Sequence, residues 1–307
     1  MSVTAAEVKQ LRERTGAGMM DCKRALAEVG GDIDAAIVLL RERGLAGASK
    51  KGGRVTAEGL VGVFPAPDAR SAVVVELNCE TDFVAKTDDF SGLLQDLGEA
   101  LLAAEGLEEG SADTVADLAL ANGEQVADRI SAAIASIGEN VSLRRFTKFT
   151  APSGRLGHYV HAGGKIGVLV EVEGATDAHS EACRVLAMQV AAANPRFVDR
   201  EQIDATEIEK ERAIYKNEAA ASGKPDKILD RIADGKMAKY FREVCLLEQE
   251  FIRDSDLDVA AFLEAQATEG SGSLVVKRFV RYQLGEGIER READLAAEVA
   301  EQIAGSS

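Results

Sequence analysis

Residues 1–55 space their apolar side chains three and four positions apart, which is the period of an α-helix. Thr4 opens the first helix with a capping-box pattern. Asp21 is expected to cap a second helix, and Asp32 is expected to open a third that ends at Gly44. Three short helices around one small core are therefore predicted for this segment.

From residue 56 onward the apolar positions alternate with polar ones, as they do in a β-strand. Segments 59–64 and 71–78 flank a turn that contains two prolines, so the pattern predicts a hairpin with 73–77 as its buried strand. Helices are expected to follow the hairpin at about 89–101, 112–121 and 123–137.

A second copy of this strand-and-helix pattern is expected to begin at Leu143. Segments 73–77 and 168–172 fall at equivalent points, each a buried strand that precedes a helix. We infer an α+β fold with a duplicated sheet-plus-helix core. The elements predicted for the second copy are strands at 144–150, 155–161 and 165–173 and a helix at 179–193.

Segment 198–247 returns to the helical period and is predicted to form a helical hairpin around a turn at 223–225. Its first helix carries only a thin apolar stripe. That stripe could contact a second copy of the chain, as in a coiled-coil dimer, or could pack on its own hairpin partner. A strand at 274–284 and an amphipathic helix through Ile288 and Val299 are expected to complete the chain.

These patterns divide the 307 residues into several units, and the length allows more than one core. The hairpin at 198–247 is inserted into the second copy of the core. The expected units are 1–55, 56–142, 143–197 together with 248–284, 198–247 and 285–307.

The net charge of −16 would repel a phosphate backbone, so a general nucleic-acid binder is not expected. No stretch reaches the roughly 18 to 20 apolar residues that a membrane-spanning helix needs. Glu7 and Lys9 stand where a signal peptide has its apolar segment, so we expect a cytoplasmic protein. The four cysteines are far apart and lack C-x-x-C spacing, which favours reduced thiols over disulfides or a zinc site.

No catalytic constellation stands out in the chain. Gly163-Gly164-Lys165 is similar to the end of a phosphate-binding loop, but Ile166 replaces the Ser or Thr that would hold magnesium. His158 and His161 are three apart on a predicted strand and would lie on opposite faces. We therefore expect a binding protein with no cofactor and no metal site, not an enzyme.

One segment breaks the local pattern. Directly after the buried strand, Asp82 and Phe83 place a carboxylate beside a large aromatic ring at a strand-to-helix corner. In one interpretation Phe83 folds back into its own core, and Thr81 or Asp82 caps the next helix. In the other, Phe83 enters a pocket on a partner while Asp82 carries negative charge to a cationic or metal-bearing site.

Several motifs, taken together, resemble bacterial elongation factor Ts, in that family's order and over nearly the whole chain. Residues 280–289 close this series with the sequence Gly285-Glu286-Gly287-Ile288-Glu289. The other matching motifs are the run 11–23, the segment Thr81-Asp82-Phe83-Val84-Ala85, the stretch Ile137-Gly138-Glu139-Asn140 and the strands around His161 and 166–170.

The resemblance implies a fold and a function. Residues 1–55 would form a ubiquitin-associated-type domain, the duplicated core would form two subdomains, and the hairpin would be a coiled-coil dimerisation module. The protein would be a guanine-nucleotide exchange factor for elongation factor Tu. Asp82 and Phe83 would intrude beside that partner's bound magnesium and loosen GDP.

The same resemblance implies further partner-binding residues. The N-terminal module and the C-terminal helix would grip the nucleotide-binding domain, and His161 would hold a distant domain of the GTPase. One of Met19 and Met20 is expected to lie in the core. Ile252-Arg253 departs from the family's apolar pair at its second position. The residues carried over are Thr81, Asp82, Phe83, Val84, Arg12, Met19, Met20, Lys23, Ile137, Gly138, His161 and Ile252.

Two other functions remain open from the residues alone. The first is an adaptor whose N-terminal module binds a peptide or ubiquitin-like domain, which would bind its partner without releasing nucleotide. The second is a metal-dependent enzyme that uses Glu80 and Asp82, which would hold a divalent ion in the isolated protein.

Overall fold

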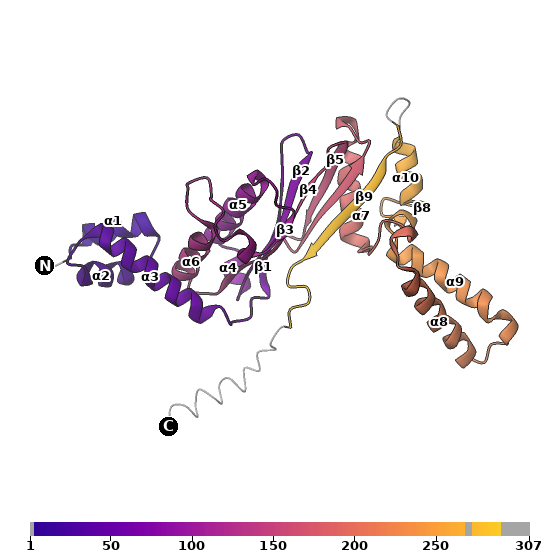
Figure 1. Cartoon of the computed structure of the whole chain (residues 1–307), viewed down its shortest axis with the longest axis horizontal. Helices are drawn as coiled ribbons and strands as arrows, with labels where there is room; N and C mark the ends of the chain where they lie inside the picture. The colour runs from indigo at the N-terminus through magenta and orange to yellow at the C-terminus, as the bar shows by residue number, and fades with distance from the viewer. Residues whose placement is uncertain (1–2, 268–271, 290–307) are drawn as a thin grey trace, which may run out of the picture.

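The N-terminal helices pack around a small core in the computed structural model, which describes residues 3–267 and 272–289. They are α1 (Ala5–Thr15), α2 (Met19–Glu28) and α3 (Ile33–Lys51), at one end of the molecule (Figure 1). The capping box at Thr4 is present, so the predicted start of the first helix is confirmed. The buried side chains of this core are Val8, Leu11, Cys22, Ala25, Leu26 and Ala36.

The first sheet is antiparallel and contains the predicted hairpin. Its strands follow the order β1 (Glu58–Pro65), β2 (Ser71–Cys79), β4 (Val141–Thr150) and β3 (Glu109–Gly110). Val73, Val75 and Leu77 of β2 contribute to the core beneath the helices of this half. Those helices are α4 (Asp82–Ala85), α5 (Asp88–Ala103) and α6 (Val126–Ile137).

Two predicted helix boundaries near the N-terminus are wrong. α2 begins at Met19, so Asp21 lies inside its first turn instead of capping it. α3 continues past Gly44, which is buried against α6. A Cβ added to Gly44 would lie 3.4 Å from the Cβ of Ala135. This glycine therefore permits close packing of two helices and does not end the first of them.

The helix predicted at 112–121 is also wrong. Most of the segment 112–121 is irregular, with only the 3₁₀ turn η1 (Ala112–Val115) at its start. Beyond it the backbone is tied to the following residues, since the N–H of Leu120 donates to the carbonyl of Glu124 at 2.8 Å. These turns replace the helical hydrogen bonds that the pattern predicted.

The second sheet has the strand order β5 (Gly154–His161), β6 (Ile166–Glu173) and β9 (Val275–Gln283). The strand predicted at 144–150 does not belong to it. As β4, that strand pairs with β2 of the first sheet, and Leu143 and Phe146 fill the first core. Helix α7 (Ser180–Ala193) covers the second sheet, as the sequence predicted.

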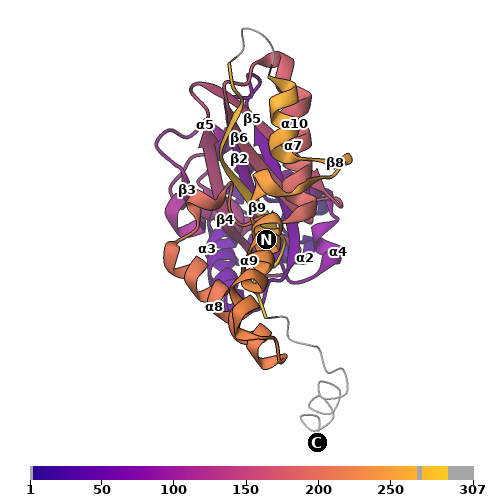
Figure 2. The same ribbon diagram turned by 90° about the vertical axis from the view of Figure 1, so that its right-hand side faces the viewer.

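Helix α10 (Val259–Gln266) joins α7 on the same side of the second sheet (Figure 2). It follows the small hairpin of β7 (Glu250–Phe251) and β8 (Asp254–Asp258). Where the two sheets meet, apolar side chains from both form a shared core, which joins the two halves. It comprises Val61, Ala72, Val74, Phe149, Ala151, Leu156, Leu169, Tyr282 and Leu284.

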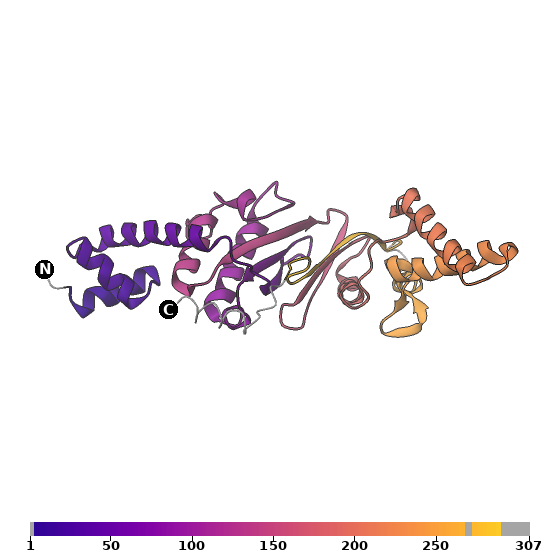
Figure 3. The same ribbon diagram turned by 90° about the horizontal axis from the view of Figure 1, so that it is seen from below.

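Helices α8 (Ala205–Ala221) and α9 (Asp226–Val244) extend from the end opposite α1–α3 (Figure 3). Ion pairs join them, including Arg212 to Asp234 at 2.9 Å. Ile208 and Tyr215 of α8 pack against the cluster of Met237, Tyr240 and Phe241 on α9. The apolar stripe of α8 thus contacts its own hairpin partner, and a homodimer through this hairpin stays a prediction.

The predicted C-terminal helix falls mostly in 290–307, outside the described residues. Among the residues that are described, no helix is both long and apolar enough to cross a membrane. The boundaries of the expected units, and the likeness of residues 1–55 to a ubiquitin-associated domain, stay predictions.

Candidate functional site

The corner between β2 and α5 is built by the short helix α4. Thr81 is its N-cap, and the Thr81 hydroxyl accepts a hydrogen bond from the N–H of Val84 at 3.4 Å. A threonine in this position satisfies a backbone donor that the first helical turn leaves open. The interpretation that Thr81 caps the helix is confirmed.

Phe83 does not fold back into the core, so that part of the first interpretation is wrong. Its side chain is 79% exposed, more than any other large apolar side chain among the described residues. The reason is the direction of the single helical turn, because Val84 and Ala85 occupy the side that packs on the first core. Burial of a phenylalanine ring is worth about 2 to 3 kcal/mol, which makes this exposure notable.

Asp82 is held beside a cation at the same corner. The Lys86 ammonium lies 2.6 Å from Oδ2 of Asp82 and 6.0 Å from the centroid of the Phe83 ring. The hydrogen bond from Lys86 lowers the pKa of the Asp82 carboxyl, and the charge of Lys165 lowers it further. Asp82 is therefore a carboxylate throughout the neutral range.

The loop after α6 braces the corner from behind. α6 ends at Ile137, which packs on the first core, and Gly138 adopts φ = 88° at the C-cap. Glu139 then accepts two hydrogen bonds from Thr81, from the backbone N–H at 2.9 Å and from the hydroxyl at 2.6 Å. The fold thus brings Ile137 and Gly138 next to the segment 81–84.

Glu80 makes the converse contact. Its Oε1 accepts the backbone N–H of Asn140 at 2.6 Å and lies 3.2 Å from Nη1 of Arg54. A carboxylate committed to these donors is a poor candidate for the metal ligand considered above. No group of three or more His, Cys, Asp or Glu side chains suited to a metal ion occurs within 3–267 and 272–289.

His161 lies at the tip of the β5–β6 hairpin, exposed to solvent. Its Nδ1 is 3.1 Å from the hydroxyl of Tyr159. The hairpin turn docks on β1, since the carbonyl of Gly164 accepts the N–H of Val61 at 2.7 Å and Lys165 lies 3.1 Å from Glu58. Glu58 pairs with Cys79 across the sheet, so this turn and the α4 corner share one edge of the molecule.

The N-terminal residues Arg12, Met19, Met20 and Lys23 are all exposed. The expectation that one of the two methionines is buried is wrong, because both lie in the first turn of α2, whose later turns fill the core. Met19 is 56% exposed and Met20 is 60% exposed. They form an apolar surface on the N-terminal module, apart from the corner.

α3 attaches this module to α6, the helix that leads to Glu139. Arg41 of α3 forms an ion pair with Asp128, and the Lys51 ammonium donates to the carbonyl of Ile134 at 3.3 Å. The module with the exposed methionines therefore contacts α6, and the loop directly after α6 contacts the Phe83 corner through Glu139 and Thr81.

Ile252 does not join the other predicted site residues. It lies in the β7–β8 turn, and its N–H donates to Oε1 of Gln189 at 2.8 Å. Its side chain is 41% exposed. Figure 1 shows β8 on the far side of the two sheets from α4.

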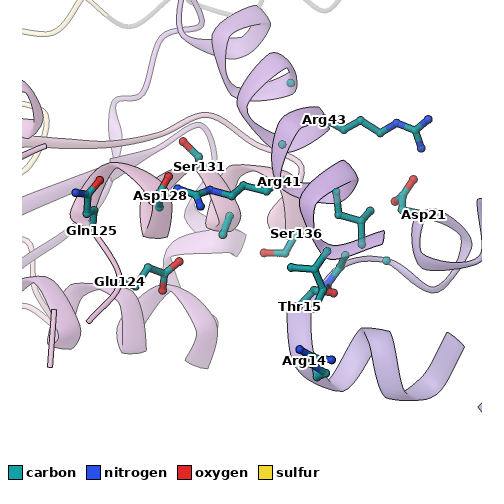
Figure 4. Close-up of a pocket in the computed structure, with 18 of the residues that line it drawn as sticks. Arg14, Thr15, Asp21, Arg41, Arg43, Glu124, Gln125, Asp128, Ser131 and Ser136 are labelled. Atoms are coloured by element: carbon teal, nitrogen blue, oxygen red, sulfur yellow. Dashed lines mark hydrogen bonds and ion pairs between the residues drawn. The ribbon is translucent and has the colours of Figure 1, made fainter. Parts of the chain in front are cut away.

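A pocket of about 780 Å³ lies between the N-terminal module and α6, and nothing in the sequence pattern predicted it (Figure 4). Its three arginines are already paired: Arg41 with Asp128, which also lines the pocket, and Arg14 and Arg43 with Asp34 and Glu28, which do not. None of the corner residues lines it. The labelled lining residues are Arg14, Thr15, Asp21, Arg41, Arg43, Glu124, Gln125, Asp128, Ser131 and Ser136.

The contacts of Glu80 and Glu139 are the part of the site that sequence reasoning missed. Glu139 lies within a motif that carries the family resemblance, but its partner Thr81 is 58 positions away. The sequence signal that could have indicated these contacts is the position of the two glutamates, Glu80 just before α4 and Glu139 just after α6.

Comparison with known proteins defines the class of this chain. A family model described as "Elongation factor TS" matches residues 80–286, beginning at the corner itself. The elongation factor Ts of Clostridium botulinum (strain Alaska E43 / Type E3) is 46% identical over 98% of this chain and 99% of its own length. That of Halothermothrix orenii is 45% identical over 99% of both chains. The chain is thus a translation elongation factor, and it belongs to the elongation factor Ts family.

Proposed function

We propose that this protein is a guanine-nucleotide exchange factor that binds elongation factor Tu in its GDP-bound state and promotes GDP release. The observation that carries the proposal is the exposure of Phe83, at 79%, on a hydrogen-bonded corner that also presents the Asp82 carboxylate. An aromatic ring held in solvent by a rigid turn is suited to enter a pocket on another protein. Membership of the elongation factor Ts family supports elongation factor Tu as that partner.

The corner acts on the partner's bound magnesium. Phe83 inserts near the ion, and Asp82 brings negative charge to its edge, so water and side chains that hold the ion are displaced. Because the ion neutralises the diphosphate, its loss weakens GDP binding. The protein performs no bond-making step and works through binding energy alone.

Other surfaces provide the grip. Met19 and Met20, flanked by Arg12 and Lys23, contact the nucleotide-binding domain, and Ile137 with Gly138 extends the corner contact. His161 holds a second domain of the GTPase. Attachment at two separated places lets the corner strain the nucleotide site between them.

The Ile252 contact belongs to a separate surface, because its turn leads into β8, which lies on the far side of the two sheets from α4 (Figure 1). A second copy of the chain could bind α8, where Ile214 is 55% exposed. We place this activity in the cytoplasm, with no direct nucleic-acid or membrane contact.

Exchange of this kind obeys thermodynamic linkage. If the factor weakens GDP binding by a given ratio, GDP weakens binding of the factor by the same ratio. GTP binding then ejects the factor and completes the cycle. The proposed function therefore requires that added nucleotide dissociates the complex.

The test is release of a fluorescent GDP analogue from purified elongation factor Tu, with and without this protein, alongside a direct binding measurement. Acceleration that depends on the protein's concentration is expected. Binding with no acceleration would favour the adaptor, while a divalent ion retained by the isolated protein would favour the metal-dependent enzyme.

A further inference from the structure

We propose that Glu139 is a positioning residue for exchange, which acts with Glu80 as a reciprocal clasp that fixes the corner carrying Phe83. The clasp consists of two backbone contacts that mirror each other. Glu139 accepts the N–H of Thr81 at 2.9 Å, and Glu80 accepts the N–H of Asn140 at 2.6 Å. Each glutamate thus binds the residue that follows the other. The inference rests on the proposed function.

The clasp also sets the direction of a hydroxyl. The Thr81 O–H donates to Oε1 of Glu139 at 2.6 Å, which leaves its oxygen free to accept the N–H of Val84 at 3.4 Å. Hydrogen bonds in such a chain strengthen one another, and those that end on a carboxylate are the stronger kind. Glu139 therefore stabilises the N-cap of the helix that carries Phe83.

The corner needs this support because α4 is only four residues long. A single turn is unstable by itself, since nucleation of a helix is costly. Phe83 contributes no packing, because it projects into solvent. The placement of its ring depends on the backbone on either side, and that backbone is tied to the loop after α6 by the clasp.

The test compares Glu139→Ala, Glu139→Gln and the control Asp96→Ala. Asp96 on α5 also accepts hydrogen bonds from another element, from Arg129 on α6 at 3.2 Å, but this contact is away from the corner. Glu139→Ala is expected to lower the maximal rate of GDP release by about tenfold, as expected for the loss of a charge-assisted hydrogen bond. The concentration for half-maximal rate should change less than about twofold, as expected for a residue that touches no partner group. Glu139→Gln keeps one acceptor oxygen, so its maximal rate should fall less than that of Glu139→Ala. The control Asp96→Ala should keep the wild-type rate.

A double variant separates positioning from general destabilisation. When Glu139→Ala is added to Phe83→Ala, the maximal rate of GDP release should fall by less than a further factor of about two, because the ring that Glu139 positions is already absent. If the loss of rate in the double variant equals the product of the losses in the two single variants, the proposal is overturned. An unchanged rate for Glu139→Ala alone would overturn it as well.

Hydrogen–deuterium exchange of the isolated protein measures how well the clasp protects the backbone amides of the corner when no partner is present. Glu139→Ala should speed amide exchange at 81–87 and 138–141 and leave β2 and α5 protected. Faster exchange throughout β2 and α5 would overturn the proposal in favour of a structural role. If wild-type protein fails to accelerate GDP release, the proposed function falls, whereas amide exchange still shows whether the clasp orders the corner.

Discussion

The Lys86 ammonium lies 2.6 Å from the Asp82 carboxylate, four positions along the chain at the other end of α4. The pair closes the short helix with opposite charges at its two ends, with the acid at the N-terminus and the base at the C-terminus. That orientation suits the helix dipole. The charge that we assign to the partner's magnesium site is therefore present before the partner arrives.

The rate of GDP release should not change near neutral pH through protonation of Asp82. The hydrogen bond from Lys86 lowers the pKa of this carboxyl, so its charge is lost only when the pH falls below the ordinary pKa of an aspartate, about 4. Asp82→Asn should reduce the maximal GDP-release rate by the same factor at about pH 6, 7 and 8. A ratio of wild-type to variant rates that shrinks toward about pH 6 would show that the carboxylate protonates there.

Removing the two exposed methionines should weaken affinity and spare the maximal rate. Met19→Ala combined with Met20→Ala removes apolar area that the partner would bury, so the half-maximal concentration should rise about tenfold or more. The melting temperature should not change, because both side chains are more than half exposed. Val38→Ala, in the same module and 57% exposed, is the control. An equal loss in the control would mean that the methionines are not the contact.

The buried carboxylate of Glu76 should matter for stability. It is inaccessible to solvent, and its oxygens lie 2.9 Å from Nη1 of Arg144 and 2.6 Å from Nε of Arg145. Glu76→Gln leaves two cations short of a partner, and the free energy of unfolding should fall by about 2 to 3 kcal/mol. Denaturant unfolding measures it. The exposed pair of Glu173 with Lys277 gives the control Glu173→Gln, which should cost less than about 1 kcal/mol.

Stability should fall in alkali partly through Cys79. Burial raises the pKa of this thiol to about 12, with the charge of Glu139 adding to the shift. The folded protein therefore keeps the proton after the unfolded chain has lost it, so the contribution is complete below about pH 9 and declines as the pH rises toward 12. Cys79→Ala should flatten the fall of the denaturation midpoint above about pH 9. An unchanged slope in the variant would contradict this assignment.

Local patterns were enough to predict most elements. The strand at 73–77 and the helix through Leu93 and Leu97 follow from spacing alone, because each buries one face against a single core. The capping box at Thr4 was likewise readable, since both of its partners lie within one turn.

Long-range pairing could not be read in the same way. The segment 144–150 is a strand by pattern, yet its choice of β2 as partner depends on which core receives Phe146. The contact of Glu139 with Thr81 joins two helix ends that no periodicity connects. The exposure of Phe83 was open for the same reason, because it depends on which side of a single turn faces the core.

The most direct measurement of the central claim is the GDP-release rate at saturating factor for wild type, Phe83→Ala and Val275→Ala. Phe83→Ala should lower the maximal rate by about one to two powers of ten while affinity for elongation factor Tu falls less, because most of the contact lies elsewhere. Val275→Ala, which shortens an exposed apolar side chain at the start of β9, should match wild type. Equal losses of rate and affinity in Phe83→Ala, or a full rate without the ring, would contradict the claim that this corner opens the nucleotide site.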